Sequence, residues 1–508
     1  MITILNEVFF IESSGKMLKL LCLIKENQEA KMIPFKNFSA CTSMIVGKNA
    51  SIDGSIMIAR NEDSKSSWPK NYVIHPRKEF TSEQIFKSPD NGFQINLPKT
   101  RFKYSGTPEW TDKFGVFEEN GINEYGVAMS ATESTYSNDL VLGADPLVKN
   151  GIGEEAMITI VLPYVKTARQ AIQRLGDIIE YYGTDESNGI LFADKNEAWY
   201  METGGGHNWV AVRIPDDDYV VIANQSAIEE VDFSDPNNFM WSRNIQNFVE
   251  TNNLNPDKTG KTFNFRHIFG TADLSDQYYN TPRVWYGLKL FSPQLEFEPT
   301  SQNLPFLNHA NRKLSLFDVE AFLSSHYQGT PYDPIGDGSK QDKTHFRPIS
   351  LAKTQEAHIL QIRPNMPTAV GGIQWLSMGV AAQSSFVPFY AGAIKTPKEY
   401  QKADGKYSPD KAYWVYKLAG VLVDPHYLQL GSKLSATQST LRTWFQQHFK
   451  QTDKETKNLS GSELEVALTD ANFAAAKKGL KEYRSLISDL VTSSTDFSPL
   501  NFKQDINL

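Results

Sequence analysis

Cysteine is scarce in this sequence. The chain of 508 residues contains two, Cys22 and Cys41, together with nine histidines. Two cysteines cannot build the disulfide framework of a small secreted domain, so a reducing compartment is favoured over an oxidising one. The histidines form no HExxH motif and show no Cys/His spacing typical of zinc. The sequence therefore gives no sign of a structural disulfide or of a metal site.

Long hydrophobic runs and an excess of positive charge are also missing. No stretch approaches the roughly 20 apolar residues of a membrane-spanning helix. The formal net charge is −8 at pH 7, which argues against nucleic acid or an anionic membrane as a partner. With 40% hydrophobic and 12% aromatic residues, the chain is instead typical of a globular protein with a substantial core.

The N-terminal segment does not match a standard signal peptide. The apolar run MLKLLCLI at 17–24 is about as long as a short signal core, but KENQEAK follows at once and offers no small-residue cleavage site. We therefore expect a cytoplasmic protein and leave export open. Because Met32 stands close upstream of Cys41, we interpret residues 1–31 as a candidate over-extended start of the chain.

The region after Cys41 is typical of short strands. Two apolar runs, TSMIVGKN and GSIMIAR, flank the segment ASIDG, in which Asp53-Gly54 predicts a hairpin turn. Further strand-like runs follow at 117–134 and 189–225, and we interpret the second region as an antiparallel meander. This succession of paired strands favours an α+β architecture over alternating βαβ units.

Helical periodicity marks two regions. Within Ala168–Tyr182 the apolar residues fall on one helical face. Thr167 and Gln170 suit a capping box before this helix, and Gly183 suits its end. Residues 409–491 also follow an amphipathic period. No repeat and no clear linker interrupts the chain, so we expect one large αβ domain with a helical C-terminal portion packed on it.

Cys41 has two interpretations. A cysteine beside a strand is more often a small buried hydrophobe than a nucleophile. If the Ala40–Cys41 bond is cut, however, Cys41 becomes the N-terminal residue and carries its own base. A free α-amine has a pKa of about 7.7–8.0 and lies within reach of its own side chain. Such a thiol needs no separate histidine, in agreement with the lack of a convincing Cys-His-Asn arrangement.

The spacing from Cys41 to Arg60 suits the second interpretation. Two short antiparallel strands joined by a tight turn bring the end of the second strand beside the start of the first. Arg60 and Asp63 should therefore lie near the new amino terminus. Asp63 could orient the ammonium group, and Arg60 could lower the pKa of the thiol. An ordinary surface Arg–Asp pair is the alternative.

The stretch ACTSMIVGKNASIDGSIMIARNED at 40–63 resembles the mature start of the cysteine dipeptidases of the N-terminal nucleophile hydrolase superfamily, the dipeptidase A family of bacteria. Other blocks resemble the same family in the same order, up to about Lys395: GINEYGVAMSATES, GIGEEAM, LPYVKTARQAI, LFADKNEAWYMETGGGHNWVAVRIPDDDYVVIANQ, YNTPRVW and RPISLAKTQEAHILQIRP. More distantly, the family resembles bile-salt hydrolases and penicillin V acylases, which share the N-terminal Cys and the Arg-x-x-Asp.

The resemblance implies a fold and a set of site residues. The fold is the four-layer αββα sandwich, and Cys41 matches the nucleophile. Arg60 and Asp63 match the Arg and Asp of the superfamily. Asn224, in VIANQ, falls where the superfamily has an oxyanion-hole Asn, although an Asn at a strand end is also common without such a role. Arg283, in NTPRVW, is the candidate for a second active-site arginine.

Two further residues are candidates for binding substrate. Thr132 and Glu133 end a strand at a place where the resemblance leads us to expect substrate-pocket residues. No metal and no organic cofactor is implied, the expected partners are dipeptides, and homo-oligomer formation is left open.

We therefore predict a hydrolase of the peptide bond in dipeptides, with Cys41 exposed by autocatalytic removal of a leader at 1–40. A hydrolase core should span 41–400, and a mainly helical portion should span 401–508. Two alternatives remain. One is an acylase of the same superfamily that cleaves a nonpeptide amide, and the other is a catalytically inactive binding scaffold.

Overall fold

The computed structural model describes residues 12–13, 16–17, 40–257 and 262–500. Cys22 and nearly all of the leader predicted at 1–40 lie outside the described residues. Within the described part of the chain, no helix combines the length and the apolar character needed to cross a membrane.

The chain forms two compact units, Met1–Ser39 and Ala40–Leu508. In the first unit, strands β1 (Glu12–Ser13) and β2 (Lys16–Met17) pair in antiparallel fashion. All elements described below belong to the second unit, which is a mixed α and β structure with antiparallel sheets and a helical C-terminal region.

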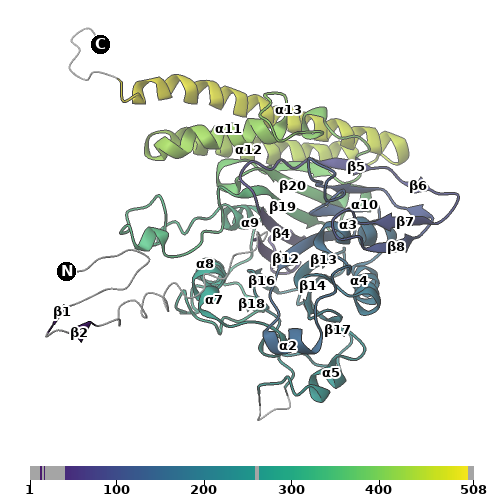
Figure 1. Ribbon diagram of the computed structural model, residues 1–508. Helices are drawn as coiled ribbons and strands as arrows, with labels where there is room; N and C mark the ends of the chain where they lie inside the picture. Colours follow the sequence, from purple (N-terminus) through teal and green to yellow (C-terminus); the bar gives the residue numbers. More distant parts are fainter. Residues whose placement is uncertain (1–11, 14–15, 18–39, 258–261, 501–508) are drawn as a thin grey trace, which may run out of the picture. The chain divides into compact units, whose positions relative to one another are not determined.

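The larger sheet has seven strands in the order β18–β16–β3–β4–β19–β20–β21, and all neighbours are antiparallel (Figure 1). Its central strands come from the beginning of the unit and its outer strands from far along the chain. The strands are β3 (Thr42–Val46), β4 (Ile56–Asp63), β16 (Asp218–Ile222), β18 (Asn308–His309), β19 (Thr354–Ile362), β20 (Gly372–Met378) and β21 (Val387–Tyr390).

The β3–β4 hairpin confirms the turn predicted at Asp53-Gly54. Gly54 has a φ of 75°, a left-handed conformation that glycine adopts without steric cost. The Asp53 carboxylate accepts hydrogen bonds from the backbone and the hydroxyl of Ser55. The register pairs Thr42 with Asn61, so the last residues of β4 lie beside Cys41.

The smaller of the two main sheets has six strands in the order β11–β12–β13–β14–β15–β17. All its neighbours are also antiparallel. Its strands are β11 (Asn120–Ile122), β12 (Ala128–Ser134), β13 (Asn188–Ala193), β14 (Ala198–Gly204), β15 (Asn208–Ile214) and β17 (Phe239–Trp241).

The meander predicted at 189–225 is correct for three strands and wrong for the fourth. Strands β13, β14 and β15 follow one another in the six-stranded sheet. Strand β16 crosses instead to the seven-stranded sheet, where it pairs with β3. Its alternate residues are apolar on both faces: Tyr219 and Val221 belong to one core cluster, and Val220 and Ile222 to another. A strand with two apolar faces is suited to a sheet that is covered on both sides.

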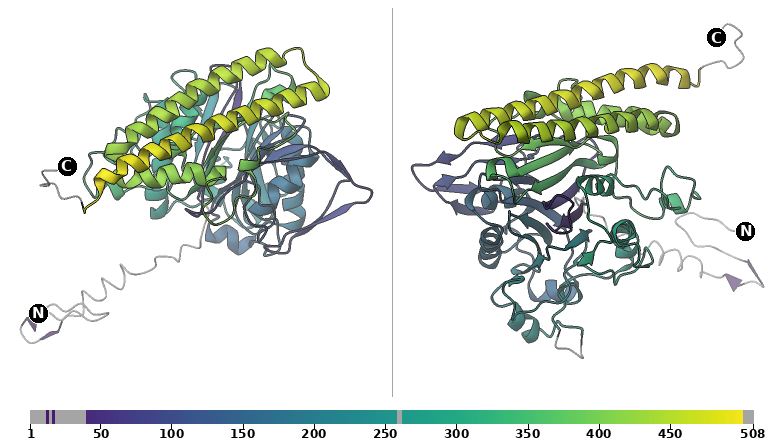
Figure 2. Two further views of the ribbon diagram at one scale, coloured as in Figure 1. Left: turned by 90° about the horizontal axis from the view of Figure 1, so that it is seen from above. Right: turned by 180° about the vertical axis from the view of Figure 1, so that it is seen from behind.

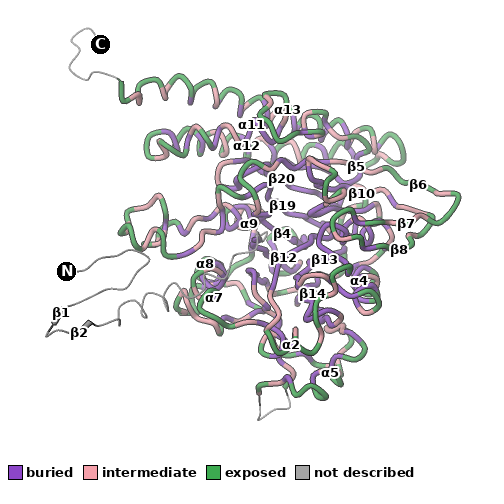
Figure 3. The backbone as a smooth tube through the Cα atoms, in the orientation of Figure 1, coloured by how far each residue is buried: buried purple, intermediate pink, exposed green. Residues whose placement is uncertain are grey.

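The two main sheets share one core cluster. Side chains of Ile45 and Ile58 from the seven-stranded sheet pack with Leu191 and Val210 from the six-stranded sheet. The other face of the six-stranded sheet packs against helices α3 and α4, and the other face of the seven-stranded sheet packs against the C-terminal helices. In Figure 3 the strands of these two sheets are accordingly buried along most of their length, and exposed backbone lies mainly outside the two sheets.

Helices connect and cover the sheets. They are α2 (Asp139–Ala144), α3 (Glu154–Val161), α4 (Ala168–Tyr182), α5 (Ile245–Thr251), α6 (Phe265–Phe269), α7 (Leu274–Tyr279), α8 (Thr281–Phe291), α9 (Leu316–Leu323), α10 (Thr368–Gly371), α11 (Ala412–Val423), α12 (Tyr427–Thr456) and α13 (Gly461–Ser494). Short 3₁₀ turns are η1 (Leu162–Tyr164), η2 (Asp342–Thr344), η3 (Ala381–Gln383), η4 (Lys398–Tyr400), η5 (Asp424–His426) and η6 (Thr495–Phe497).

Three two-stranded ribbons precede the six-stranded sheet in the chain. They pair β5 (Val73–His75) with β10 (Tyr104–Gly106), β6 (Lys78–Glu79) with β9 (Thr100–Arg101), and β7 (Gln84–Lys87) with β8 (Gln94–Leu97).

Helix α4 confirms the predicted helix at 168–182. The Thr167 side chain accepts a hydrogen bond from the Gln170 backbone, as expected of an N-cap residue. The Gln170 side chain accepts from the Lys166 backbone, so the reciprocal half of the predicted capping box is displaced by one residue. The predicted apolar face is buried except for Tyr182, which is 36% exposed.

The C-terminal helices cover one face of the seven-stranded sheet. Figure 2 shows the long helices α12 and α13 running side by side along this face, as the amphipathic pattern predicted. The edge strand β21 is closed by Asn472 of α13, whose side chain accepts from the Tyr390 backbone N–H (2.7 Å) and donates to the Tyr390 carbonyl (3.1 Å). At Tyr390, an amide side chain thus supplies the two hydrogen bonds that a neighbouring strand would make.

Replacement of Asn472 by alanine should destabilise the protein. The Tyr390 N–H and carbonyl lose their side-chain partner in a buried place, so we expect the free energy of unfolding to fall by about 1–3 kcal/mol. Urea denaturation measures this change. Gln451→Ala on the exposed side of α12 is the control, and an equal effect of both substitutions would contradict this role of Asn472.

Candidate active site

Cys41 lies directly before β3 and is fully buried. Its Sγ donates to Glu62 Oε2 at 3.1 Å and accepts from Arg60 Nη1 at 3.0 Å. Both partners stand on β4, two residues apart, so their side chains point to the same face of the sheet. The hairpin therefore delivers a cation and a carboxylate to the thiol.

Arg60 connects Cys41 to the six-stranded sheet. Its guanidinium is fully buried. It donates to the hydroxyl of Ser130 (3.0 Å), to the main-chain oxygens of Glu119 (2.9 Å), Ala131 (2.8 Å) and Thr132 (2.6 Å), and to the carboxylates of Glu62 (2.5 Å) and Glu119 (2.8 Å). This is a buried, multiply bonded side chain and not the surface Arg–Asp pair that the sequence left open.

The charge around Cys41 does not produce a reactive thiolate in the uncut chain. Burial and the Glu62 carboxylate raise the pKa of the Cys41 thiol well above its ordinary value. Arg60 acts in the opposite direction, as predicted, but the first two effects outweigh it. While Cys41 is preceded by Ala40, the thiol therefore keeps its proton.

A wider network of charges surrounds this site. Oxygens of Glu62, Glu119 and Glu154 lie within 4.8 Å of one another, which is the spacing of a metal site. Arg60 contacts the first two carboxylates, and Lys70 Nζ is bonded to Glu119. Because protein cations already occupy the positions between these carboxylates, the cluster is a poor fit to a divalent ion.

Asp63 faces a different set of partners from Arg60. Its carboxylate accepts from Arg347 Nη2 and from the Thr354 hydroxyl, both at 2.5 Å. Its carbonyl oxygen accepts from the backbone N–H of Ala40 at 2.6 Å. Asp63 thus contacts the residue before Cys41 through its main chain, and its side chain positions an arginine.

Asn224 and Arg283 lie on the other side of Cys41. Strand β16 pairs Ile222 with Ser43, which places Asn224 beside the start of β3. Arg283 of α8 donates to the Cys41 carbonyl oxygen and, at 2.8 Å, to Asn224 Oδ1. Since a guanidinium only donates hydrogen bonds, it fixes the orientation of the amide, and Nδ2 points to the opposite side, where it meets the Ser134 carbonyl at 3.1 Å.

Thr132 and Glu133 lie near the end of β12, next to this group. Glu133 Oε2 accepts from the Ser43 hydroxyl at 2.5 Å. Its other oxygen and the Thr132 hydroxyl are buried and have no hydrogen-bond partner among the described residues. Burial raises the pKa of Glu133 to about 7, against the opposing effects of Arg283 and the Ser43 hydrogen bond.

All seven residues singled out from the sequence thus lie in one connected region, and the structure adds two that sequence reasoning missed. Glu62 could have been found, because it is two residues from Arg60 and shares its face of β4. Arg347 gave no local signal, since it stands in an irregular segment between η2 and β19 and reaches the site only through the tertiary fold.

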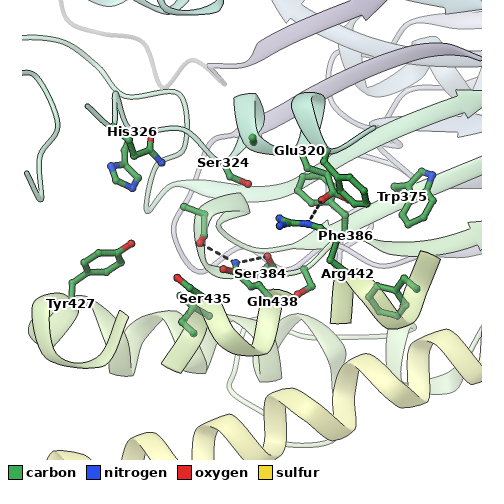
Figure 4. A pocket seen from close by; sticks show the side chains of 17 residues that line it. Glu320, Ser324, His326, Trp375, Ser384, Phe386, Tyr427, Ser435, Gln438 and Arg442 are labelled. Atoms are coloured by element: carbon green, nitrogen blue, oxygen red, sulfur yellow. Dashed lines mark hydrogen bonds and ion pairs between the residues drawn. The ribbon is translucent and has the colours of Figure 1, made fainter. Parts of the chain in front are cut away.

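A separate cavity of about 180 Å³ lies between α9, the segment joining β20 to β21, and α12 (Figure 4). None of its lining residues is a predicted site residue. Arg442 pairs with Glu320 at 3.2 Å, and Gln438 donates to the carbonyls of Ala382 and Ser384. These polar groups bond to one another across the junction and hold α12 in place.

Comparison with known proteins shows that this protein is a peptidase. The model of peptidase family C69 matches residues 40–440, which begins one residue before Cys41 and includes every site residue named above. The chain belongs to this family, and it is a hydrolase that acts on peptide bonds.

Curated relatives carry consistent names. A probable dipeptidase of Latilactobacillus sakei is 45% identical over 92% of this chain and 98% of its own length. Dipeptidase A of Lactobacillus helveticus is 40% identical over 85% of this chain and 92% of its own. A dipeptidase of Bifidobacterium longum is 37% identical, with 85% and 86% covered.

The raised pKa of Glu133 predicts a pH-dependent stability. A buried carboxyl that binds its proton more tightly in the folded state stabilises the protein below the unfolded pKa, and this contribution is lost as the pH rises from about 4.5 to about 7. Glutamine can keep the Ser43 hydrogen bond but has no proton to lose. The stability of Glu133→Gln relative to the parent should therefore rise across this window, by about 3 kcal/mol.

Urea denaturation at a series of pH values measures this difference. Both chains should carry Cys41→Ala so that they have the same covalent structure. Glu250→Gln, at an exposed position of α5, is the matched control. Parallel pH profiles for the parent and Glu133→Gln would contradict the shifted pKa.

Proposed function

We propose that this protein is a cysteine-type dipeptidase whose nucleophile is Cys41, freed by cleavage of the Ala40–Cys41 bond. In this proposal residues 1–40 are a leader, 41–400 form the hydrolase core, 401–508 form a helical C-terminal portion, and the sheets and helices form the four-layer αββα sandwich of N-terminal nucleophile hydrolases. The dipeptidase names of the relatives support the substrate class. The contacts around Cys41 support the nucleophile.

The freed α-amine supplies the base for dipeptide hydrolysis. Once Cys41 is N-terminal, its amine takes the proton from the thiol, and the thiolate attacks the carbonyl carbon of the dipeptide. The same proton then passes to the leaving amine as the carbon–nitrogen bond breaks. Water hydrolyses the resulting thioester and restores the enzyme. The positive charge of Arg60 beside Sγ stabilises the thiolate during this cycle.

Asn224 is proposed to stabilise the oxyanion. Its Oδ1 is held by Arg283 and one Nδ2 hydrogen by the Ser134 carbonyl, so the second Nδ2 hydrogen is the donor proposed to act on a substrate oxygen. A preorganised donor of this kind acts on the charge that develops in the tetrahedral intermediate. Arg283 acts through Asn224 and through its contact with the Cys41 carbonyl, and is therefore a positioning residue.

The observation that carries the substrate class is the mixed charge around Cys41. A dipeptide has an ammonium and a carboxylate within a few bonds of its scissile amide. Beside Cys41 stand Glu133, with one unpartnered oxygen among the described residues, and the guanidinium groups of Arg283 and Arg347. We propose that Glu133 and Thr132 receive the ammonium end of the substrate. A long apolar acyl chain, which the alternative acylase would need, finds no matching surface among these side chains.

The activity prediction separates the dipeptidase from both alternatives. The purified protein should begin at Cys41, hydrolyse unblocked dipeptides and cleave N-acetylated dipeptides at least about tenfold more slowly, since the blocked substrate has no ammonium for Glu133. Iodoacetamide should abolish activity, and EDTA should not. Cys41→Ala should keep its leader and be inactive, while Cys22→Ser should behave as the wild type. Inhibition by EDTA that zinc reverses, or full activity of Cys41→Ala, would overturn the cysteine mechanism.

The oxyanion role of Asn224 is tested by kinetics. Asn224→Ala should lower kcat by about 10²-fold or more, because it removes a donor aimed at the intermediate. Leader removal and the unfolding midpoint should remain measurable. Asn308→Ala changes another buried asparagine of the same sheet and serves as control. A near-normal kcat for Asn224→Ala would make it a strand-end residue only.

A further inference from the structure

Both backbone polar groups of Ala40, the residue that precedes Cys41, are hydrogen-bonded. The Ala40 N–H donates to the Asp63 carbonyl at 2.6 Å, and the Ala40 carbonyl oxygen accepts from Arg347 Nη2 at 2.9 Å. Ala40 itself is 8% exposed. The carbonyl next to Cys41 is therefore buried and polarised by a cation.

Arg347 is fixed in this position by several contacts. Its Nη2 is 2.5 Å from Asp63 Oδ2, and its Nη1 donates to the Thr42 hydroxyl (3.3 Å) and the Pro348 carbonyl (2.9 Å). Asp63 is held in turn by Thr354. Burial works against the charge, but the Asp63 carboxylate outweighs it and raises the pKa of Arg347. The guanidinium is thus permanently charged and held where negative charge on the Ala40 oxygen would form.

The thiol of the uncut chain has a proton acceptor of its own. The Cys41 thiol donates to Glu62 Oε2 at 3.1 Å, and the α-nitrogen, tied up in the amide, cannot act as a base. Burial and the negative charge of Glu119 raise the pKa of the Glu62 carboxyl, which makes its ionised form a stronger proton acceptor than an exposed carboxylate.

We propose that Glu62 and Arg347 are catalytic residues of leader removal, a set distinct from the α-amine and Asn224 that act on dipeptides. This inference rests on the proposed function, since it assumes that the Ala40–Cys41 bond is cut by Cys41 itself. It assigns a task to Glu62, which has no role in the proposed dipeptide hydrolysis, and a further task to Arg347.

In this proposal, leader removal needs no reactant other than water. Glu62 takes the thiol proton as Sγ bonds to the Ala40 carbonyl carbon, and the negative charge on the Ala40 oxygen is stabilised by Arg347. The carbon–nitrogen bond breaks, and the proton passes from Glu62 to the nitrogen, which becomes the α-amine of Cys41. Water then hydrolyses the thioester, which leaves a carboxylate on Ala40 and a free thiol on Cys41.

The test follows leader removal by intact mass in full-length chains that carry Arg347→Gln, Arg347→Lys or Glu62→Gln. Loss of one oxyanion donor typically costs 10²–10³-fold in rate, so Arg347→Gln and Glu62→Gln should each slow leader removal by at least about 10²-fold. Arg347→Lys keeps the cation beside Asp63 and should recover part of the rate. Hydroxylamine, which cleaves thioesters, should not accelerate the two glutamine variants, because their thioester does not form.

Arg363→Gln is the matched control. Arg363 also forms a largely buried pair with a carboxylate, Asp453. It follows Ile362, the last residue of β19, whereas Thr354, the partner of Asp63, is the first residue of this strand. At ~3.4 Å per strand residue, the two ends of β19 are roughly 27 Å apart. The leader of Arg363→Gln should be removed at the wild-type rate. Circular dichroism checks that each variant is folded, and Arg347→Lys retains the ion pair if Arg347→Gln unfolds.

The outcomes separate this inference from the proposal on which it rests. If the wild type keeps its leader, the proposed maturation is wrong. If the wild type loses its leader and Arg347→Gln and Glu62→Gln lose theirs equally fast, the assignment of Glu62 and Arg347 is wrong while the dipeptidase proposal stands. Acceleration of both variants by hydroxylamine would also overturn it, because the thioester would then form without them.

Discussion

The burial of the Arg60 guanidinium is the constraint on which the site depends. This one side chain spans both main sheets: it starts from β4, contacts the thiol of Cys41, and donates to the main chain of Ala131 and Thr132 in β12. A buried cation is tolerated only when its donors are satisfied and its charge is balanced. Glu62 and Glu119 supply that balance, so the carboxylates beside Cys41 and the arginine between the sheets require one another.

A second group of charges lies at the opposite side of Cys41. Burial and the nearby Arg347 lower the pKa of Arg283 to about 10, because two guanidinium groups converge on the Thr42 hydroxyl. The Asp63 carboxylate balances the positive charge of Arg347. The remaining positive charge faces the start of β3, where the carbonyl oxygens of Ala40 and Cys41 now accept hydrogen bonds. In the proposed cut form, Arg347 Nη2 would lose the Ala40 carbonyl and keep Asp63 as its acceptor.

Much of the fold could be predicted from the sequence, because it is encoded in local signals. The Asp53-Gly54 turn, the helix at 168–182 and the C-terminal helices each have a period or a cap that does not depend on distant residues. The path of β16 could not be predicted in the same way. The turn before it is compatible with continuing the meander, and only the core clusters on both its faces determine that it joins β3.

The same distinction between local sequence signals and tertiary contacts applies to the candidate site. The sequence by itself was enough to predict that Arg60 returns beside Cys41, because a hairpin fixes these neighbours through its turn and register. It also determined the family through its ordered blocks. Only the tertiary structure decided that burial and Glu62 outweigh Arg60 in raising the pKa of the thiol, that Arg283 orients Asn224, and that Arg347 contacts the Ala40 carbonyl. Dielectric environment and contacts across hundreds of residues are properties of the packed chain, and no local pattern in a sequence encodes them.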